Sequence, residues 1–98
     1  MSWATKYIKN LKAGETVQFR PKGNSMTPRI KSGQLCKVKP VDIIDLKTND
    51  VVLCRVGGSD YLHIVTAIDN GRVQISNNKG HINGWTRTVY GKLIKVED

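Results

Sequence analysis

Short segments in which apolar and polar residues alternate run through most of the chain after Glu15, and this pattern predicts β-strands. Glycine, proline and asparagine turns bound these segments. The expected strands cover residues 16–20, 34–39, 50–56, 61–68, 72–76 and 88–96. Residues 50–56 are apolar almost throughout, which predicts a central strand. Residues 57–60 and Asp69-Asn70-Gly71 have the composition of hairpin turns, so we expect mostly antiparallel pairing.

Three other segments depart from the strand pattern. Trp3 to Ala13 repeats apolar residues at helical spacing, and Gly14 follows as a stop signal, so we expect one N-terminal helix. Residues 41–47 are a connection with a short helical turn, and the polar, glycine-rich residues 77–85 are expected to be a loop. The whole pattern predicts a small, mostly β, antiparallel fold with one short helix, as a single domain over residues 1–98.

Composition narrows the class of protein. The chain has 98 residues, of which 39% are hydrophobic, and no apolar run approaches the roughly 20 residues of a spanning helix. The first residues lack the apolar core of a signal peptide, so we expect a soluble, cytoplasmic protein without a membrane partner. Cys36 and Cys54 form no CxxC pair and lie far in sequence from the histidines. We therefore expect reduced, partly buried thiols, no zinc site and no other cofactor.

The formal net charge of +8 indicates a basic surface. The sixteen lysines and arginines are spread along the chain, at higher density in the first forty residues. Such a field attracts nucleic acid or an acidic partner. The aromatic residues do not alternate with the basic ones as they do in a base-stacking surface. Solvated surface charge is the simpler interpretation, and nucleic acid stays an alternative partner.

A serine occupies a turn that can present a nucleophile. Ser25 lies between Gly23, whose backbone is unrestricted, and Pro28, which fixes its own φ, directly after the expected strand 16–20. A serine hydroxyl needs a neighbouring base. His63 lies within an apolar strand, where partial burial would keep its imidazole neutral near pH 7. The residues alone leave His63 as either a base or a structural histidine.

A family resemblance connects these features. The segment Gly23-Asn24-Ser25-Met26-Thr27-Pro28, continued to Gly33, resembles the Gly-x-Ser-Met-x-Pro…Gly box of the superfamily of signal peptidases and LexA-type self-cleaving repressors. Residues 50–56 and 61–65 resemble later segments of that superfamily, in the same order. The resemblance implies a serine peptidase fold, a peptide or protein substrate and Ser25 as the nucleophile. It also implies His63 as the base, as in the endoplasmic-reticulum and archaeal signal peptidases. The candidate substrate-binding residues around the serine are Gly23, Asn24, Met26 and Pro28.

The chain departs from the family at several positions. The histidine version carries aspartates after the strand that follows the base, whereas this chain has Asn77 and Asn83 in that region. Asparagine can orient a catalytic histidine, so both are candidates for the third member, although both also suit turns. Asn49 and Gln34 replace a glycine and an aspartate of the family pattern.

Three functional hypotheses follow. The first is a serine peptidase that uses a Ser25–His63 dyad. The second is a catalytically inactive module of the same fold that binds nucleic acid or protein through its basic surface. The third is a phage or mobile-element regulator that mimics a LexA-type domain. We expect neither membrane processing nor self-cleavage, because the sequence shows no membrane anchor and no helix-turn-helix segment, and only twenty-four residues precede Ser25.

Overall fold

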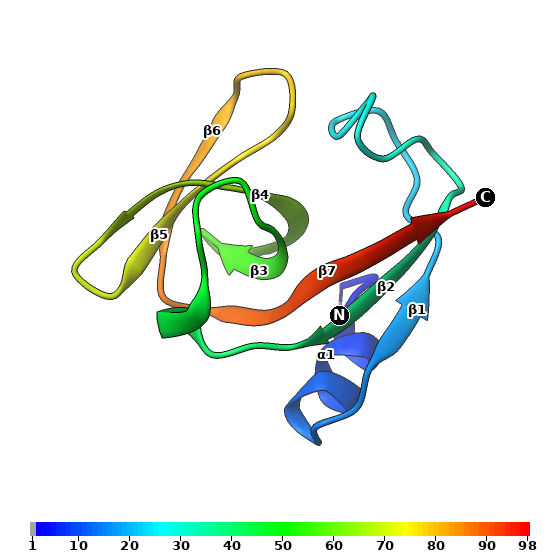
Figure 1. The fold of residues 1–98 in the computed structure, drawn as a ribbon, viewed down its shortest axis with the longest axis horizontal. Coiled ribbons are helices and arrows are strands. Elements are labelled where there is room, and N and C mark those ends of the chain that lie inside the picture. Colours follow the sequence, from blue (N-terminus) through cyan, green and yellow to red (C-terminus); the bar gives the residue numbers. More distant parts are fainter. Residues whose placement is uncertain (1) are drawn as a thin grey trace.

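A computed structural model describes residues 2–98, and within them one short helix and seven strands form the fold (Figure 1). The elements in chain order are α1 (Thr5–Lys12), β1 (Val17–Phe19), β2 (Leu35–Pro40), the 3-10 turn η1 (Ile43–Asp45), β3 (Val51–Val56), β4 (Ser59–Asp69), β5 (Arg72–Ser76), β6 (Ile82–Thr86) and β7 (Val89–Glu97). The strands make one sheet in the order β1-β2-β7-β3-β4-β5-β6, with every pairing antiparallel. The expected mostly β fold with one short N-terminal helix is confirmed. No helix among residues 2–98 has the length and apolar character to cross a membrane.

The prediction of a loop after β5 was partly wrong. Residues 77–85 were expected to lack regular structure, but β6 begins at Ile82 and pairs with β5. Asn83 and Gly84 have low strand propensity, so the local pattern missed this strand. The backbone of β5 supplies the hydrogen-bonding partners that local propensity does not. The pairing joins Val73 to Thr86 and Ile75 to Gly84.

The central position predicted for residues 50–56 is confirmed. β3 is the fourth strand of seven and pairs with β4 on one side and β7 on the other. The C-terminal strand β7 lies between β2 and β3. The sheet therefore places the last strand of the chain beside β2, the second strand of the chain. Figure 1 shows the loop between β1 and β2 (cyan) and the loop between β5 and β6 (yellow) at the same end of the molecule.

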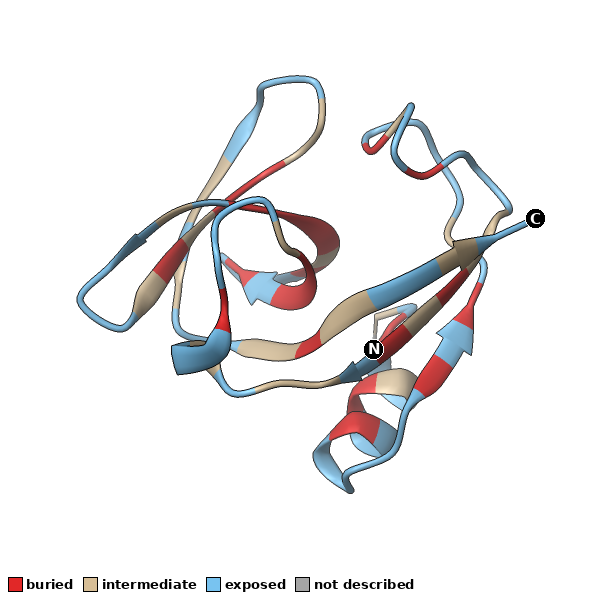
Figure 2. Cartoon of the chain, in the orientation of Figure 1, coloured by how far each residue is buried: buried red, intermediate tan, exposed pale blue. Residues whose placement is uncertain are grey.

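Two apolar clusters stabilise the sheet, and their core residues are among those coloured as buried in Figure 2. The first joins α1 to strands β1 to β4 and includes Leu11 and Leu53. The second packs residues of β3, β4 and β5, among them Val65 and Ile75. Each fully buried aliphatic side chain of this kind contributes about 1.5–3 kcal/mol. Strand β2 and helix α1 both approach β7 closely at Gly91, where a Cβ atom would lie 2.7 Å from the Lys39 carbonyl oxygen and 3.0 Å from Leu11.

The two cysteines lie in separate clusters. Cys36 packs with the first cluster and Cys54 with the second, and both are free and buried. Burial and, to a lesser extent, the negative charge of Asp60 together raise the pKa of the Cys54 thiol to about 12. This thiol therefore stays protonated at neutral pH and is a poor nucleophile. Both cysteines are core residues.

Candidate active site

The chain between β1 and β2 forms a compact loop that carries Ser25. The Gly33 amide donates to the Pro21 carbonyl at 2.8 Å and closes the base of the loop. The Ile30 amide donates to the Met26 carbonyl at 3.0 Å, and both side chains are buried in the first cluster. These two apolar anchors hold the loop against the body of the protein. Ser25 is left exposed between them and the base of the loop.

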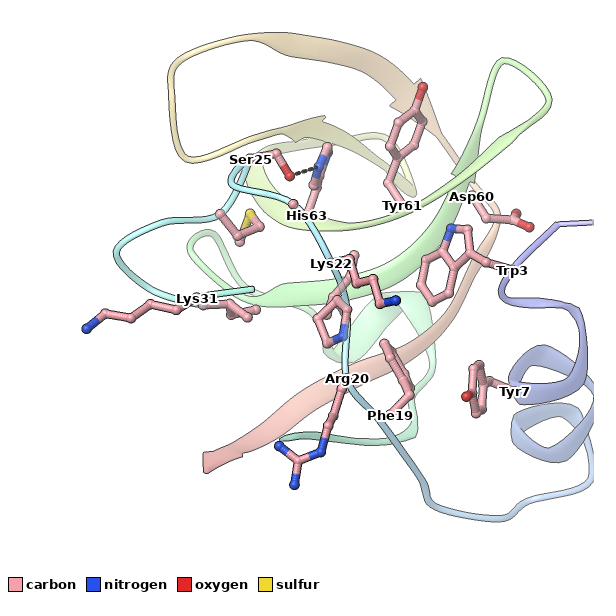
Figure 3. Close-up of a pocket in the computed structure, with 15 residues that line it drawn as sticks. Trp3, Tyr7, Phe19, Arg20, Lys22, Ser25, Lys31, Asp60, Tyr61 and His63 are labelled. Carbon is pink, nitrogen blue, oxygen red and sulfur yellow. Dashed lines mark hydrogen bonds between the residues drawn. The ribbon is translucent and has the colours of Figure 1, made fainter. Parts of the chain in front are cut away.

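The structure brings Ser25, His63 and Asn83 together in one chain of hydrogen bonds. Ser25 Oγ lies 3.1 Å from His63 Nε2, the contact drawn in Figure 3. On the other side of the ring, His63 Nδ1 lies 2.7 Å from Asn83 Oδ1. The amide oxygen can only accept, so the proton resides on Nδ1 and Nε2 presents its lone pair to the serine. This is the tautomer that a general base requires.

Strand β4 holds the imidazole firmly. His63 pairs with Val52 of β3 and is only 7% exposed. The ring of Tyr61 stacks on it with centroids 4.9 Å apart and planes inclined by 24°. Burial lowers the pKa of His63 from its ordinary value of 6.5; the hydrogen bond to Asn83 opposes that effect, and the charge of His81 adds to it. The imidazole is therefore neutral and able to accept a proton at pH 7.

Neighbouring loops brace the serine from two sides. The Asn78 amide donates to the Ser25 carbonyl at 2.8 Å, and its side-chain amide donates to the Thr27 carbonyl at 2.9 Å. Arg29 donates to the side chain and the carbonyl of Asn49 at 2.8 and 2.9 Å. Sequence reasoning missed these bracing roles. They join loops distant in sequence, and nothing in the local pattern signals them.

The two asparagine candidates have different positions. Asn83, in β6, contacts His63 as described above. Asn77 does not: its Oδ1 accepts from the amides of Lys79 and His81 at 2.8 and 3.0 Å. Asn77 thus shapes the turn between β5 and β6, and the structure does not support it as the third member of the site.

Two of the four candidate substrate-binding residues line the cleft beside the serine. Gly23 and Met26 do so, with the Met26 side chain buried beneath it. Asn24 and Pro28 are exposed and do not line it. The Asn24 carbonyl instead accepts from the Thr27 amide at 3.2 Å and from its hydroxyl at 2.9 Å. Asn24 is therefore a turn residue of the serine loop.

The cleft has a volume of about 530 Å³ and lies between the end of β1 and the start of β4. Among the described residues, β1 pairs only with β2, and residues 59–63 of β4 pair only with β3, because the pairing with β5 starts at Ile64. Each strand therefore has a free backbone edge next to the catalytic candidates. Free edges of this kind can bind an extended peptide as an added strand.

Neither protein-family models nor curated protein sequences give a significant match to this chain. The interpretation of the site consequently depends on its own geometry.

Proposed function

We propose that this protein is a serine peptidase-like hydrolase in which Ser25, His63 and Asn83 form the catalytic set. The observation that carries the proposal is the hydrogen-bond chain from Ser25 Oγ through the His63 ring to Asn83 Oδ1, at 3.1 and 2.7 Å. The resemblance of the serine segment to the signal peptidase and LexA-type superfamily supports the same assignment.

The chemistry follows the geometry. His63 Nε2 takes the hydroxyl proton as Ser25 Oγ bonds to the substrate carbonyl carbon. The imidazolium then gives that proton to the leaving amine, the C–N bond breaks and an acyl-serine remains. Water, activated by the same imidazole, hydrolyses the ester and regenerates the serine. Asn83 fixes the tautomer of His63 throughout, but as a neutral group it stabilises the imidazolium less than a carboxylate would.

Backbone groups supply the remaining requirements of a peptidase. Within residues 2–98 the Ser25 amide N–H has no hydrogen-bond acceptor, so it is available to a developing oxyanion. The free edge of β4 at residues 59–63 ends at His63, so an extended peptide on this edge would bring a carbonyl group toward Ser25. The cleft thus suits an unfolded peptide segment.

A fluorophosphonate probe tests the proposal without knowledge of the substrate, because it reacts with activated serines. We expect covalent labelling of the wild type at Ser25, located by mass spectrometry of the digested protein. Ser25→Ala and His63→Ala should both lose it. Ser59→Ala is the matched control for Ser25→Ala, since Ser59 is exposed and does not line the cleft. Absence of labelling, or equal labelling of His63→Ala, would count against a peptidase and favour a binding module of the same fold.

A further inference from the structure

We propose that the cleft beside Ser25 selects acidic peptide segments that carry a large apolar side chain, with Trp3 and Lys22 as the specificity-determining residues. This inference rests on the proposed function, because it takes the ligand to be an extended peptide. It adds the class of substrate and two residues outside the catalytic set.

An aromatic wall forms one side of the cleft. Trp3, Tyr7 and Phe19 all line it, and Trp3 is 50% exposed. The Trp3 ring lies 5.4 Å from the Phe19 ring at 57°, and the Tyr7 ring stacks on Phe19 at 4.7 Å. An indole exposed in a concave site gains by packing against an apolar side chain. The wall therefore provides a subsite for a large apolar residue.

The N-terminal segment is held where it can present this indole. The Ser2 hydroxyl donates to the carboxylate of Asp60, at the start of β4, and the Ser2 amide donates to Thr5 Oγ1 at 3.1 Å. These contacts tie the residue before Trp3 to the strand that also carries His63. The aromatic wall and the catalytic candidates consequently belong to one rigid surface.

Positive charge dominates the rest of the cleft. Arg20, Lys22 and Lys31 line it, and no carboxylate of residues 2–98 lies within ion-pair distance of any of them. In Figure 3 the Lys22 side chain extends toward Trp3, while Arg20 and Lys31 extend outward. An acidic residue that packs beside the aromatic wall would meet the Lys22 ammonium group first.

Asp60, the one carboxylate among residues 2–98 that lines the cleft, does not cancel this charge. Asp60 accepts two hydrogen bonds from the Arg55 guanidinium, at 2.8 and 3.1 Å, and its side chain is 1% exposed. His63 is neutral at pH 7, as its lowered pKa requires. The cleft thus offers unpaired cations to its ligand, and concave surfaces of one charge concentrate ligands of the opposite charge.

Peptide binding to the full-length Ser25→Ala variant tests the inference. The probes are dye-labelled peptides with identical flanks and a centre of Glu-Phe-Glu, Gln-Phe-Gln, Lys-Phe-Lys or Glu-Ala-Glu, followed by fluorescence anisotropy. At low salt we expect Glu-Phe-Glu to bind about three- to tenfold more tightly than Gln-Phe-Gln, because each exposed ion pair can raise the binding affinity by up to about fivefold. Glu-Ala-Glu should bind about tenfold more weakly, because it lacks the apolar side chain.

Substitutions locate the effect. Lys22→Glu should remove the preference for Glu-Phe-Glu over Gln-Phe-Gln, whereas Lys9→Glu, an equal charge change on an exposed helix position outside the cleft, should preserve it. Trp3→Ala should remove the preference for Phe over Ala, and Trp3→Phe should keep most of it. Trp85→Ala is the matched control, since Trp85 is the only other tryptophan and lies outside the cleft. Circular dichroism verifies that each variant is folded.

The outcomes separate this inference from the proposed function. Equal affinity for all four peptides, or equal effects of Lys22→Glu and Lys9→Glu, would overturn the inference even if the probe labels Ser25. The expected preference in a protein whose Ser25 resists the probe would overturn the peptidase and leave the cleft as a binding site for acidic, apolar peptide segments.

Discussion

Substitution of Asn83 tests the hydrogen-bond chain directly, because the Asn83 side chain forms a hydrogen bond with His63 and not with Ser25. Asn83→Ala leaves the Nδ1–H of a 7% exposed imidazole without its acceptor at 2.7 Å. An unsatisfied buried donor costs about 1–3 kcal/mol, so the free energy of unfolding should fall by that amount. The ring also loses its fixed tautomer. Since general-base catalysis contributes roughly 10²–10⁴-fold, we expect the probe to label Ser25 about 10–100-fold more slowly.

Asn83→Asp should act in the opposite direction. A carboxylate accepts the same hydrogen bond and also stabilises the imidazolium, so it raises the pKa of His63 relative to the wild type. A stabilisation of about 1.4 kcal/mol in the transition state corresponds to tenfold faster labelling at pH values where the imidazole is neutral. Protonated His63 cannot act as a base. The acidic fall in rate should therefore lie below pH 6.5 in the wild type and at higher pH in the variant.

The assay is the pH dependence of the labelling rate, with stability measured in parallel by urea denaturation. Asn77→Ala is the matched control, because its Oδ1 accepts only loop amides. It should cost about 1 kcal/mol in stability and leave the pH midpoint unchanged. If Asn83→Ala and Asn83→Asp both label at the wild-type rate with the wild-type midpoint, Asn83 has no part in the site and the reasoning is refuted.

Three further predictions concern stability. Folding lowers the pKa of His63, so as the pH falls the unfolded chain takes up this proton before the folded protein does. The free energy of unfolding should therefore decline as the pH falls from 6.5 to the lower native pKa. In His63→Gln this part of the decline should vanish, and an unchanged pH slope in urea titrations of the variant would contradict the argument. Leu53→Ala removes a fully buried side chain from the central strand and should cost about 2–5 kcal/mol in urea denaturation, so a loss below about 1 kcal/mol would be inconsistent with the packing described. Gly91→Ala places a Cβ 2.7 Å from the Lys39 carbonyl oxygen and should cost roughly 1–3 kcal/mol; thermal unfolding at the wild-type temperature would show that β2 and α1 do not pack against Gly91 as closely as the structure indicates.

Local patterns in the sequence predicted much of the fold and two residues of the candidate site. The apolar run of β3, the strand patterns of β4 and β5, the hairpin turns between them and the helical spacing before Gly14 all depend on neighbouring residues, so they can be read without knowledge of the rest of the chain. Ser25 was recognisable because a glycine and a proline shape its turn. His63 was a candidate because it lies within an apolar strand, but the family resemblance, and not the local pattern, favoured a base over a structural histidine.

Tertiary structure decided how these parts meet. Ser25 and His63 are 38 positions apart, and they come together only because the serine loop packs over β4. The choice of Asn83 over Asn77 depends on β6, a strand with weak local propensity, and on a register shift against β5 between Ile75 and Ser76. The insertion of β7 between β2 and β3 was equally invisible to local patterns. Local conformational preferences act over a few residues, whereas strand partners and loop contacts are selected by the packing of the whole chain.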